Sequence, residues 1–269
     1  MNYALLSHTE LKTVAPEPIT IPRVIKDNNN LWFVKYKKGT IDEEKRDLLG
    51  YLLAKEFCNI AEVKLLSDAE HADIKTLIGL DIESTPQNTF LVRLAHSYKL
   101  DELPQRTIEK AVATELIYSV WIRRRDTHSM NRVYVEGIPL FFDHQTAFLG
   151  DIENSHSTVF FKNSPDHGHP ASWRIKVMLA TEKMDTIKAR NVPENEKAYH
   201  YIYDQDVLLT EIKNAEVLIR NLGSKNLIPM IISAGFYPRM IDWINDFLSN
   251  NLNTLSSDIE KMKTIIFSS

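Results

Sequence analysis

Two short apolar runs near the middle of the chain constrain its fold most strongly. Residues 133–135 and 138–142 favour strands, and Glu136 and Gly137 join them. Glycine adopts positive φ without steric penalty, so the joint predicts a hairpin turn. A hairpin brings its two ends together. We therefore expect Asn131, which precedes the first run, to lie beside Asp143, which follows the second.

A further acid, Asp126, lies five residues before Asn131. Carboxylate and amide oxygens are ligands that Mg²⁺ prefers, and a neighbouring carboxylate can orient an attacking hydroxyl. This is the arrangement that phosphoryl transfer needs. The sequence thus predicts a phosphotransferase site around Asp126, Asn131 and Asp143.

The N-terminal part of the chain predicts a second hairpin. Residues 22–27 and 31–38 favour strands, and the three asparagines between them tolerate the left-handed conformation of tight turns. In the second strand Lys35 shares a face with Leu31 and Phe33. A lysine on an apolar strand face requires an anionic partner if it is buried. From this strand alone, the preferred interpretation is that Lys35 lies near a strand end and reaches water.

A helix is predicted over 41–57, because five apolar side chains recur at helical spacing along it. Glu44 and Asp47 are three residues apart and share one face of this helix, so either acid could pair with a lysine on a neighbouring strand. Strands are predicted at 61–66 and 89–94, separated by a polar stretch. This part of the chain has a mixed α and β composition.

Most of the remaining chain follows the helical period. A helix is predicted over 107–121, and four more follow an irregular polar stretch at 150–171; they cover 173–190, 206–221, 227–234 and 240–252. Three consecutive arginines, 123–125, follow the first of these helices. A run of cations at the C-terminal end of a helix is usually solvated and favourable to the helix dipole, so that interpretation is preferred over phosphate contact.

Composition limits the class of protein. The net charge of −4 argues against nucleic-acid binding through the whole surface, though not against a local basic patch, and the sequence contains no clear nucleic-acid-binding motif. No run approaches the roughly 18 uncharged apolar residues of a membrane span, and residues 1–10 do not resemble a signal peptide. The single cysteine, Cys58, cannot form an internal disulfide, which favours a reducing compartment. We therefore expect a cytoplasmic protein. Nothing in the sequence indicates its oligomeric state.

Three motifs resemble the HipA-like kinases and, more distantly, the phosphatidylinositol kinases. Residues 126–131, Asp-Thr-His-Ser-Met-Asn, are similar to the Asp-Arg-His-x-x-Asn loop of that family. Phe142-Asp143-His144 is similar to its metal-binding motif, and Phe33-Val34-Lys35 resembles its lysine strand. The likeness covers about residues 20–150, and the helical remainder agrees in type only. The chain departs from the family at Thr127, where an arginine is frequent, and in 14–22, which contains no glycine.

The resemblance implies an α+β, two-lobed protein-kinase-like fold. Residues 1–97 would form a small mixed β/α N-lobe, and residues 98–269 would form a mainly α-helical C-lobe. Together the two lobes would make one kinase-like domain.

The resemblance also assigns residues to the nucleotide. Lys35 would neutralise the α- and β-phosphates of ATP, held in place by Asp47 or by Glu44 one turn earlier. Backbone groups near the adenine would come from three consecutive strand residues, Val92, Arg93 and Leu94.

The catalytic roles follow in the same way. Asn131 and Asp143 would bind Mg²⁺, and Asp126 would orient the attacking hydroxyl or accept its proton. His128 would support the loop by hydrogen bonding, with direct contact to phosphate as the second alternative. The implied activity is ATP- and Mg²⁺-dependent phosphorylation of a serine or threonine hydroxyl on a protein substrate.

Two alternatives stay open. A lipid, a small molecule or a nucleotide could supply the acceptor hydroxyl, because the helical part that would select the acceptor carries no readable motif. A nucleotide-binding pseudokinase that regulates a partner is the other alternative, motivated by the missing glycines in 14–22.

Overall fold

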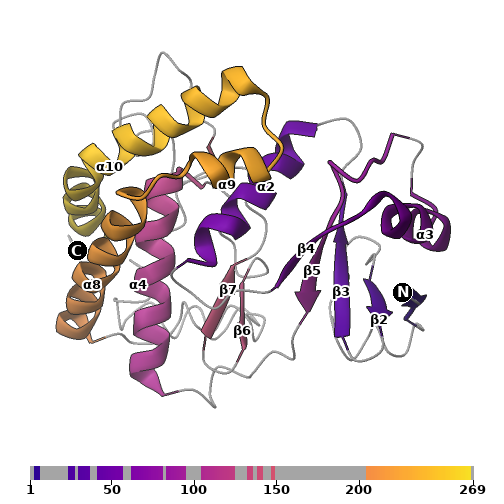
Figure 1. The fold of residues 1–269 in the computed structure, drawn as a ribbon. Coiled ribbons are helices and arrows are strands. Elements are labelled where there is room, and N and C mark those ends of the chain that lie inside the picture. The colour runs from indigo at the N-terminus through magenta and orange to yellow at the C-terminus, as the bar shows by residue number, and fades with distance from the viewer. Residues whose placement is uncertain are drawn as a thin grey trace.

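The computed structural model describes residues 3–6, 24–27, 30–36, 41–56, 62–80, 83–94, 104–124, 132–135, 138–141, 147–148 and 204–267. Within these ranges the chain is a mixed α+β structure, with antiparallel strands in its first part and helices through most of its second (Figure 1). The first part contains β1 (Tyr3–Leu5), β2 (Val24–Asp27), β3 (Asn30–Lys35), α2 (Ile41–Ala54), β4 (Val63–Leu65), α3 (Asp68–Ile78) and β5 (Phe90–Leu94). The second contains α4 (Gln105–Ile122), β6 (Arg132–Val135), β7 (Ile138–Phe141), α8 (Gln205–Gly223), α9 (Ile228–Ser233) and α10 (Pro238–Phe267).

Five strands form one antiparallel sheet with the order β1-β2-β3-β5-β4. The predicted hairpin of β2 and β3 is confirmed, with Asp27 opposite Asn30. Strand β5 lies between β3 and β4, so the two segments predicted as strands after α2 are also confirmed. Strand β1 was not predicted and occupies the opposite edge of the sheet.

The sheet is covered by a helix on each face. On one face, alternate side chains of β3 pack against α3; this cluster comprises Ile25, Trp32, Val34, Tyr36, Leu66, Ile74, Leu80 and Leu91. The other face presents Phe90 and Val92 to α2, where the ring of Tyr51 meets Phe90 edge-on at 6.0 Å between ring centroids. Successive residues of a strand point to opposite faces, which explains this division.

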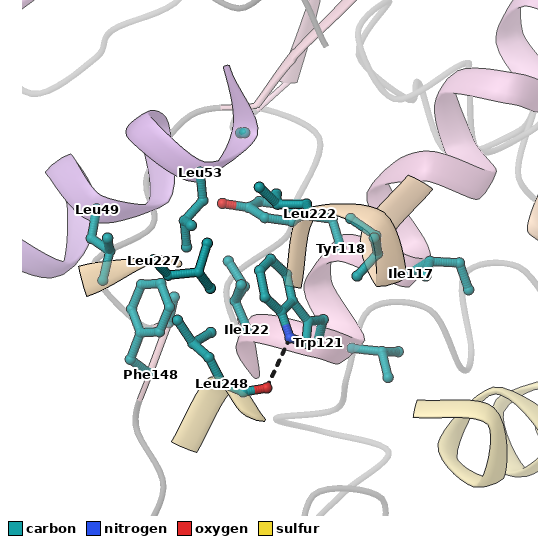
Figure 2. Close-up of a cluster of buried hydrophobic side chains, with 14 of the residues drawn as sticks. Leu49, Leu53, Ile117, Tyr118, Trp121, Ile122, Phe148, Leu222, Leu227 and Leu248 are labelled. Atoms are coloured by element: carbon teal, nitrogen blue, oxygen red, sulfur yellow. Dashed lines mark hydrogen bonds between the residues drawn. The ribbon is translucent and has the colours of Figure 1, made fainter. Parts of the chain in front are cut away.

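The larger core lies among the helices, with α4 packed against α8 and α10. Trp121, near the C-terminal end of α4, is fully buried in this core (Figure 2). Its indole N–H donates to the carbonyl of Leu248 on α10 over 3.1 Å, which satisfies the one polar group of a buried ring. Figure 1 shows α2 between this group of helices and the sheet.

Two predictions about helices need correction. The polar stretch after β4 is a helix, α3, and the last helix continues to Phe267 rather than ending near 252. The helices predicted over 107–121, 206–221 and 227–234 are confirmed as α4, α8 and α9, whereas 173–190 falls outside the described residues. None of the described helices combines the length and the apolar character needed to cross a membrane.

Candidate functional site

Lys35, the last residue of β3, forms an ion pair with Asp47 of α2. Its Nζ lies 3.1 Å from Asp47 Oδ2, and the two side chains are 11% and 0% exposed. A carboxylate that is fully withdrawn from water needs a compensating cation, since a buried unpaired charge is very costly. The ring of Phe33 is also close, with its centroid 5.5 Å from the lysine Nζ. The junction of β3 and α2 therefore holds a cation in a defined place.

The amphipathic pattern of α2 explains why its acids face inward. Asp47 is followed directly by the buried Leu48 and Leu49, and Glu44, one turn earlier, is only 1% exposed. On the same helix the Nζ of Lys45 lies 3.9 Å from the ring centroid of Tyr237. This contact joins α2 to the segment between α9 and α10. The helix that carries Asp47 is thus fixed from two sides.

The three residues assigned to the adenine are all in β5. Val92 is paired with Phe33 of β3 and with Val63 of β4, and the N–H of Arg93 donates to the carbonyl of Glu62. These pairings engage the backbone of Val92 and Arg93 within the sheet. Leu94, the last residue of β5, is paired with Leu31 of β3.

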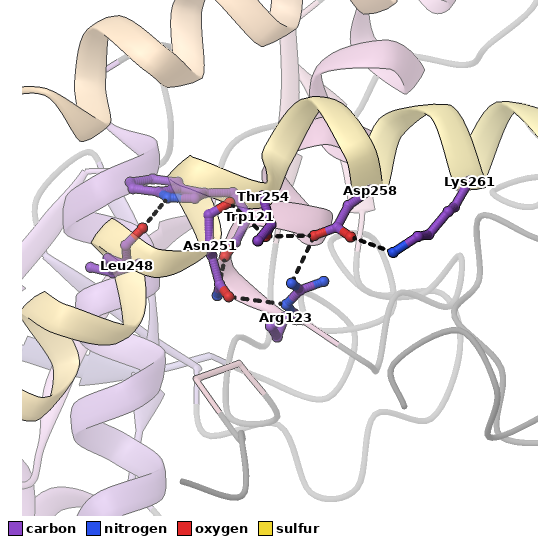
Figure 3. A network of polar contacts seen from close by, with 7 residues as sticks. All are labelled: Trp121, Arg123, Leu248, Asn251, Thr254, Asp258 and Lys261. Carbon is purple, nitrogen blue, oxygen red and sulfur yellow. Dashed lines mark hydrogen bonds and ion pairs between the residues drawn. The ribbon is translucent and has the colours of Figure 1, made fainter. Parts of the chain in front are cut away.

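The first two arginines after α4, Arg123 and Arg124, are buried, which corrects for these two the prediction that the run of charges is solvated. Arg125 lies outside the described residues. Arg123 is 4% exposed, and its Nη2 lies 2.8 Å from Asp258 Oδ2 (Figure 3). Its Nε donates to Asn251 Oδ1 over 3.3 Å. Both partners belong to α10. Burial lowers the pKa of the Arg123 guanidinium below its ordinary value, and the adjacent Asp258 carboxylate opposes that shift.

The next arginine is held from within α4. Arg124 is completely buried, and its Nη1 lies 3.3 Å from Glu115 Oε1. Each of these two cations thus has a buried carboxylate as its partner. Arg123 is paired with an acid of α10, and Arg124 with an acid of α4. That pairing explains why the end of α4 tolerates charges inside the protein.

The described backbone returns to α4 at Phe148. The N–H of Phe148 donates to the carbonyl of Ile122 over 2.8 Å, and the Phe148 ring meets Phe247 of α10 edge-on. Arg123 and Phe148 have φ of 55° and 58°, the only positive values among the described non-glycine residues. This conformation is unfavourable for L-residues, and such strain is concentrated at functional sites. The segment between Arg123 and Phe148 is thus attached at both of its ends to α4 and α10.

Within that segment the predicted hairpin is confirmed. Strand β6 pairs with β7 in antiparallel register, with Arg132 opposite Phe141 and Val135 opposite Ile138. The residues assigned to catalysis and metal binding, Asp126, His128, Asn131 and Asp143, lie outside the described residues. Their roles stay predictions.

Among the residues that the structure describes, no three acidic, histidine or cysteine side chains gather as a metal site. The predicted Mg²⁺ ligands are not part of that search, since they lie outside these ranges. Their amide and carboxylate oxygens agree with the ligand chemistry of a hard cation.

Three residues of α10 that contact the C-terminal end of α4 were not predicted from the sequence: Leu248, through its carbonyl, and the side chains of Asn251 and Asp258. Asn251 Nδ2 donates to the carbonyl of Trp121 over 2.8 Å, and Asp258 pairs with Arg123. More than 120 positions separate these partners in the chain. The helical spacing of apolar residues predicts α10 from the sequence, but this spacing does not show which residues the polar side chains of α10 contact.

No protein-family model matches the chain, and no curated protein matches it by sequence. Among solved structures, it is similar to the proinflammatory kinase CtkA of Helicobacter pylori, with a TM-score of 0.40 and 12% identity. The match covers 91% of this chain and 90% of that one.

Proposed function

We propose that this protein is an ATP- and Mg²⁺-dependent kinase of the HipA-like type that phosphorylates serine or threonine hydroxyls of a protein. The observation that carries the proposal is the ion pair of Lys35 and Asp47 at the junction of β3 and α2. A buried ion pair contributes little net stability, so stability alone is a weak reason to place one there. A cation held by a neighbouring acid is, however, what binding of a polyphosphate requires.

The closure of the chain between α4 and Phe148 supports the same function. Asp126 lies two residues beyond Arg124, and Asp143 lies five residues before Phe148, whose N–H bonds back to α4. Asn131 is covalently bonded to Arg132, which pairs with Phe141 two residues before Asp143. Chain connectivity therefore favours the convergence of the three oxygen-bearing side chains.

The proposed roles divide between the two parts of the chain. Lys35 would contact the α- and β-phosphates, Asp47 would hold that lysine, and the end of β5 at Leu94 would approach the base. Residues 1–97 and 98–269 would be the two lobes on either side of the nucleotide. Their boundary falls between β5 and α4.

On the catalytic side, Asp126 would orient the acceptor hydroxyl and accept its proton, and His128 would support the loop. Asn131 and Asp143 would bind Mg²⁺, whose charge neutralises phosphate oxygens. The fixed attachment of the segment at Arg123 and Phe148 would keep these side chains in place before the substrate binds.

The test is transfer of radiolabelled phosphate from γ-labelled ATP by the purified chain, with protein, lipid and small-molecule acceptors in separate reactions. We expect label on serine or threonine of a protein. Asp126→Asn should lower the rate by about 10² to 10⁴ while the protein stays folded. Asp242→Asn, which neutralises an exposed acid on α10, is the matched control and should transfer phosphate like the wild type.

Each other outcome overturns a stated part of the proposal. Label only in lipids or small molecules would refute the protein acceptor. Full activity of Asp126→Asn would refute the role of that acid. Nucleotide binding without transfer to any acceptor would identify a pseudokinase instead.

A further inference from the structure

Helix α10 lies against the C-terminal end of α4 and contacts it through several polar side chains (Figure 3). The amide of Asn251 has two functions there, since its Nδ2 donates to the carbonyl of Trp121 while its Oδ1 accepts from Arg123 Nε. The last carbonyls of a helix have no partner within the helix, and Asn251 satisfies one of them. The amide therefore fixes both the end of α4 and the first side chain beyond it.

Asp258 is itself held in position. Its Oδ2 accepts from Thr254 Oγ1 over 2.9 Å in addition to contacting Arg123, and its Oδ1 lies 3.5 Å from Lys261 Nζ. The Asp258 side chain is 1% exposed. A carboxylate with contacts on both oxygens has little freedom to follow a moving partner. The guanidinium of Arg123 is consequently bound to a rigid site on α10.

Arg123 is also the residue at which the chain changes direction. It is the C-cap of α4, in the left-handed conformation, and its N–H donates to the carbonyl of Ser119. Glycine is the usual residue at such a position, because a Cβ makes this conformation unfavourable. An arginine at this position lacks the conformational freedom of glycine, but its side chain can bind polar partners. The direction in which the chain continues toward Asp126 is set at this residue.

We propose that Arg123 is a positioning residue for the kinase reaction. Its contacts with Asn251 and Asp258 of α10 fix the direction in which the chain leaves α4 toward Asp126. This inference rests on the proposed function. Asp258 and Asn251 act through Arg123 and do not touch the substrate. Helix α10 would then serve as the support of the active site as well as part of the core.

A second polar network, which joins α8 to α10, provides a matched control. Arg220 of α8 lies 2.9 Å from Glu216 and donates to the carbonyl of Leu252 and to Ser256 of α10. It attaches the same stretch of α10 to a different helix. Loss of either arginine weakens the packing of α10, but only loss of Arg123 should affect the segment after α4.

The experiment compares Arg123→Gln, Arg123→Lys, Asp258→Asn and Arg220→Gln with the wild type. Thermal unfolding first gives the folded fraction of each variant. We expect Arg123→Gln and Asp258→Asn to lower kcat by about 10², since a displacement of about 1 Å costs that much, with an unchanged KM for ATP. Arg123→Lys keeps the cation for Asp258 and should recover part of kcat. Arg220→Gln should keep kcat.

Amide hydrogen exchange provides a second measurement that does not depend on activity. Peptides covering 125–131 should exchange faster in Arg123→Gln than in Arg220→Gln. If the wild type transfers no phosphate, the proposed function fails, and faster exchange still supports Arg123 as the anchor of this segment. Equal exchange in the two variants, or an equal loss of kcat in both, would overturn the inference.

Discussion

The Nζ of Lys35 lies 3.1 Å from Oδ2 of Asp47, and the Asp47 side chain has no exposed surface. The same sheet offers a second lysine paired with a helix acid, since Lys64 of β4 lies 2.7 Å from Glu70 of α3. These side chains are 23% and 19% exposed, so the second pair is in much better contact with water. The two pairs lie on different strands and use different helices. The Lys64–Glu70 pair can therefore serve as a control when the function of the Lys35–Asp47 pair is tested.

Replacing Lys35 with methionine should weaken ATP binding by about 10- to 100-fold, because a hydrogen bond to a charged group contributes about 1.5–3 kcal/mol. Lys64→Met should leave ATP binding unchanged. Titration calorimetry with a non-hydrolysable ATP analogue and Mg²⁺ measures both constants. Equal affinities for wild type and Lys35→Met would exclude this lysine from the nucleotide site.

The stability of Lys35→Met shows what the lysine contributes to folding, apart from its contribution to ATP binding. Lys35→Met leaves Asp47 buried without this cation and should lower the free energy of unfolding by about 3–5 kcal/mol. Adding Asp47→Asn should restore much of that loss but none of the ATP affinity. Urea unfolding of the two single variants and the double variant tests the coupling. Additive losses would mean that the pair does not act as a unit.

Glu70 gives the protein a defined sensitivity to acid. The hydrogen bond from Lys64, followed by that from the backbone of Ser67, lowers the pKa of Glu70 from 4.5 to about 2. A depressed carboxyl pKa stabilises the folded state above pH 4.5, and this stability is lost as the pH falls toward 2. After solvent screening the contribution is about 1 kcal/mol. Chemical unfolding between pH 3 and 5 should show a smaller slope with pH in Glu70→Gln than in the wild type.

His71 adds a dependence on pH nearer neutrality. Its side chain is 6% exposed on α3, and burial lowers its pKa below 6.5, with a further decrease from Lys75. The unfolded chain therefore binds the proton more readily, so stability should fall as the pH drops below 6.5. His71→Leu should flatten this part of the profile, measured by unfolding at several pH values. An unchanged slope would show that His71 is not the titrating group.

Helix α3 is the element that the sequence could have revealed but did not. Ser67 and Glu70 form a capping box, and Gly79 ends the helix at φ 64°. Both are recognised start and stop signals of a helix. They were outweighed by the polar composition of the stretch. The apolar side chains on one face of α3 are few, because a single row of them is enough to cover the sheet.

The strands and the longer helices could be predicted because their apolar period matches the burial that the fold gives them. The alternation in β3 agrees with Trp32 and Val34 being buried. The position of Asp47 beside Lys35 was implied only by the resemblance to the kinase family, because local spacing left Glu44 and Asp47 both open as partners of a strand lysine. The burial of Arg123 could not be predicted in this way, because it depends on Asp258, 135 positions later in the chain. Polar partners supplied by tertiary packing leave no periodic signal.

The contact between Lys45 and Tyr237 leads to a last prediction about how α2 is held. The lysine is 4% exposed and its Nζ lies 3.9 Å from the ring centroid, whereas the tyrosine is 53% exposed. Tyr237→Ala should lower the free energy of unfolding by about 1–2 kcal/mol, because it removes a partly desolvated cation–π contact. Tyr237→Phe retains the ring and should stay within about 0.5 kcal/mol of the wild type. If urea unfolding gives the same loss for both variants, the hydroxyl and not the ring would be the group that holds α2.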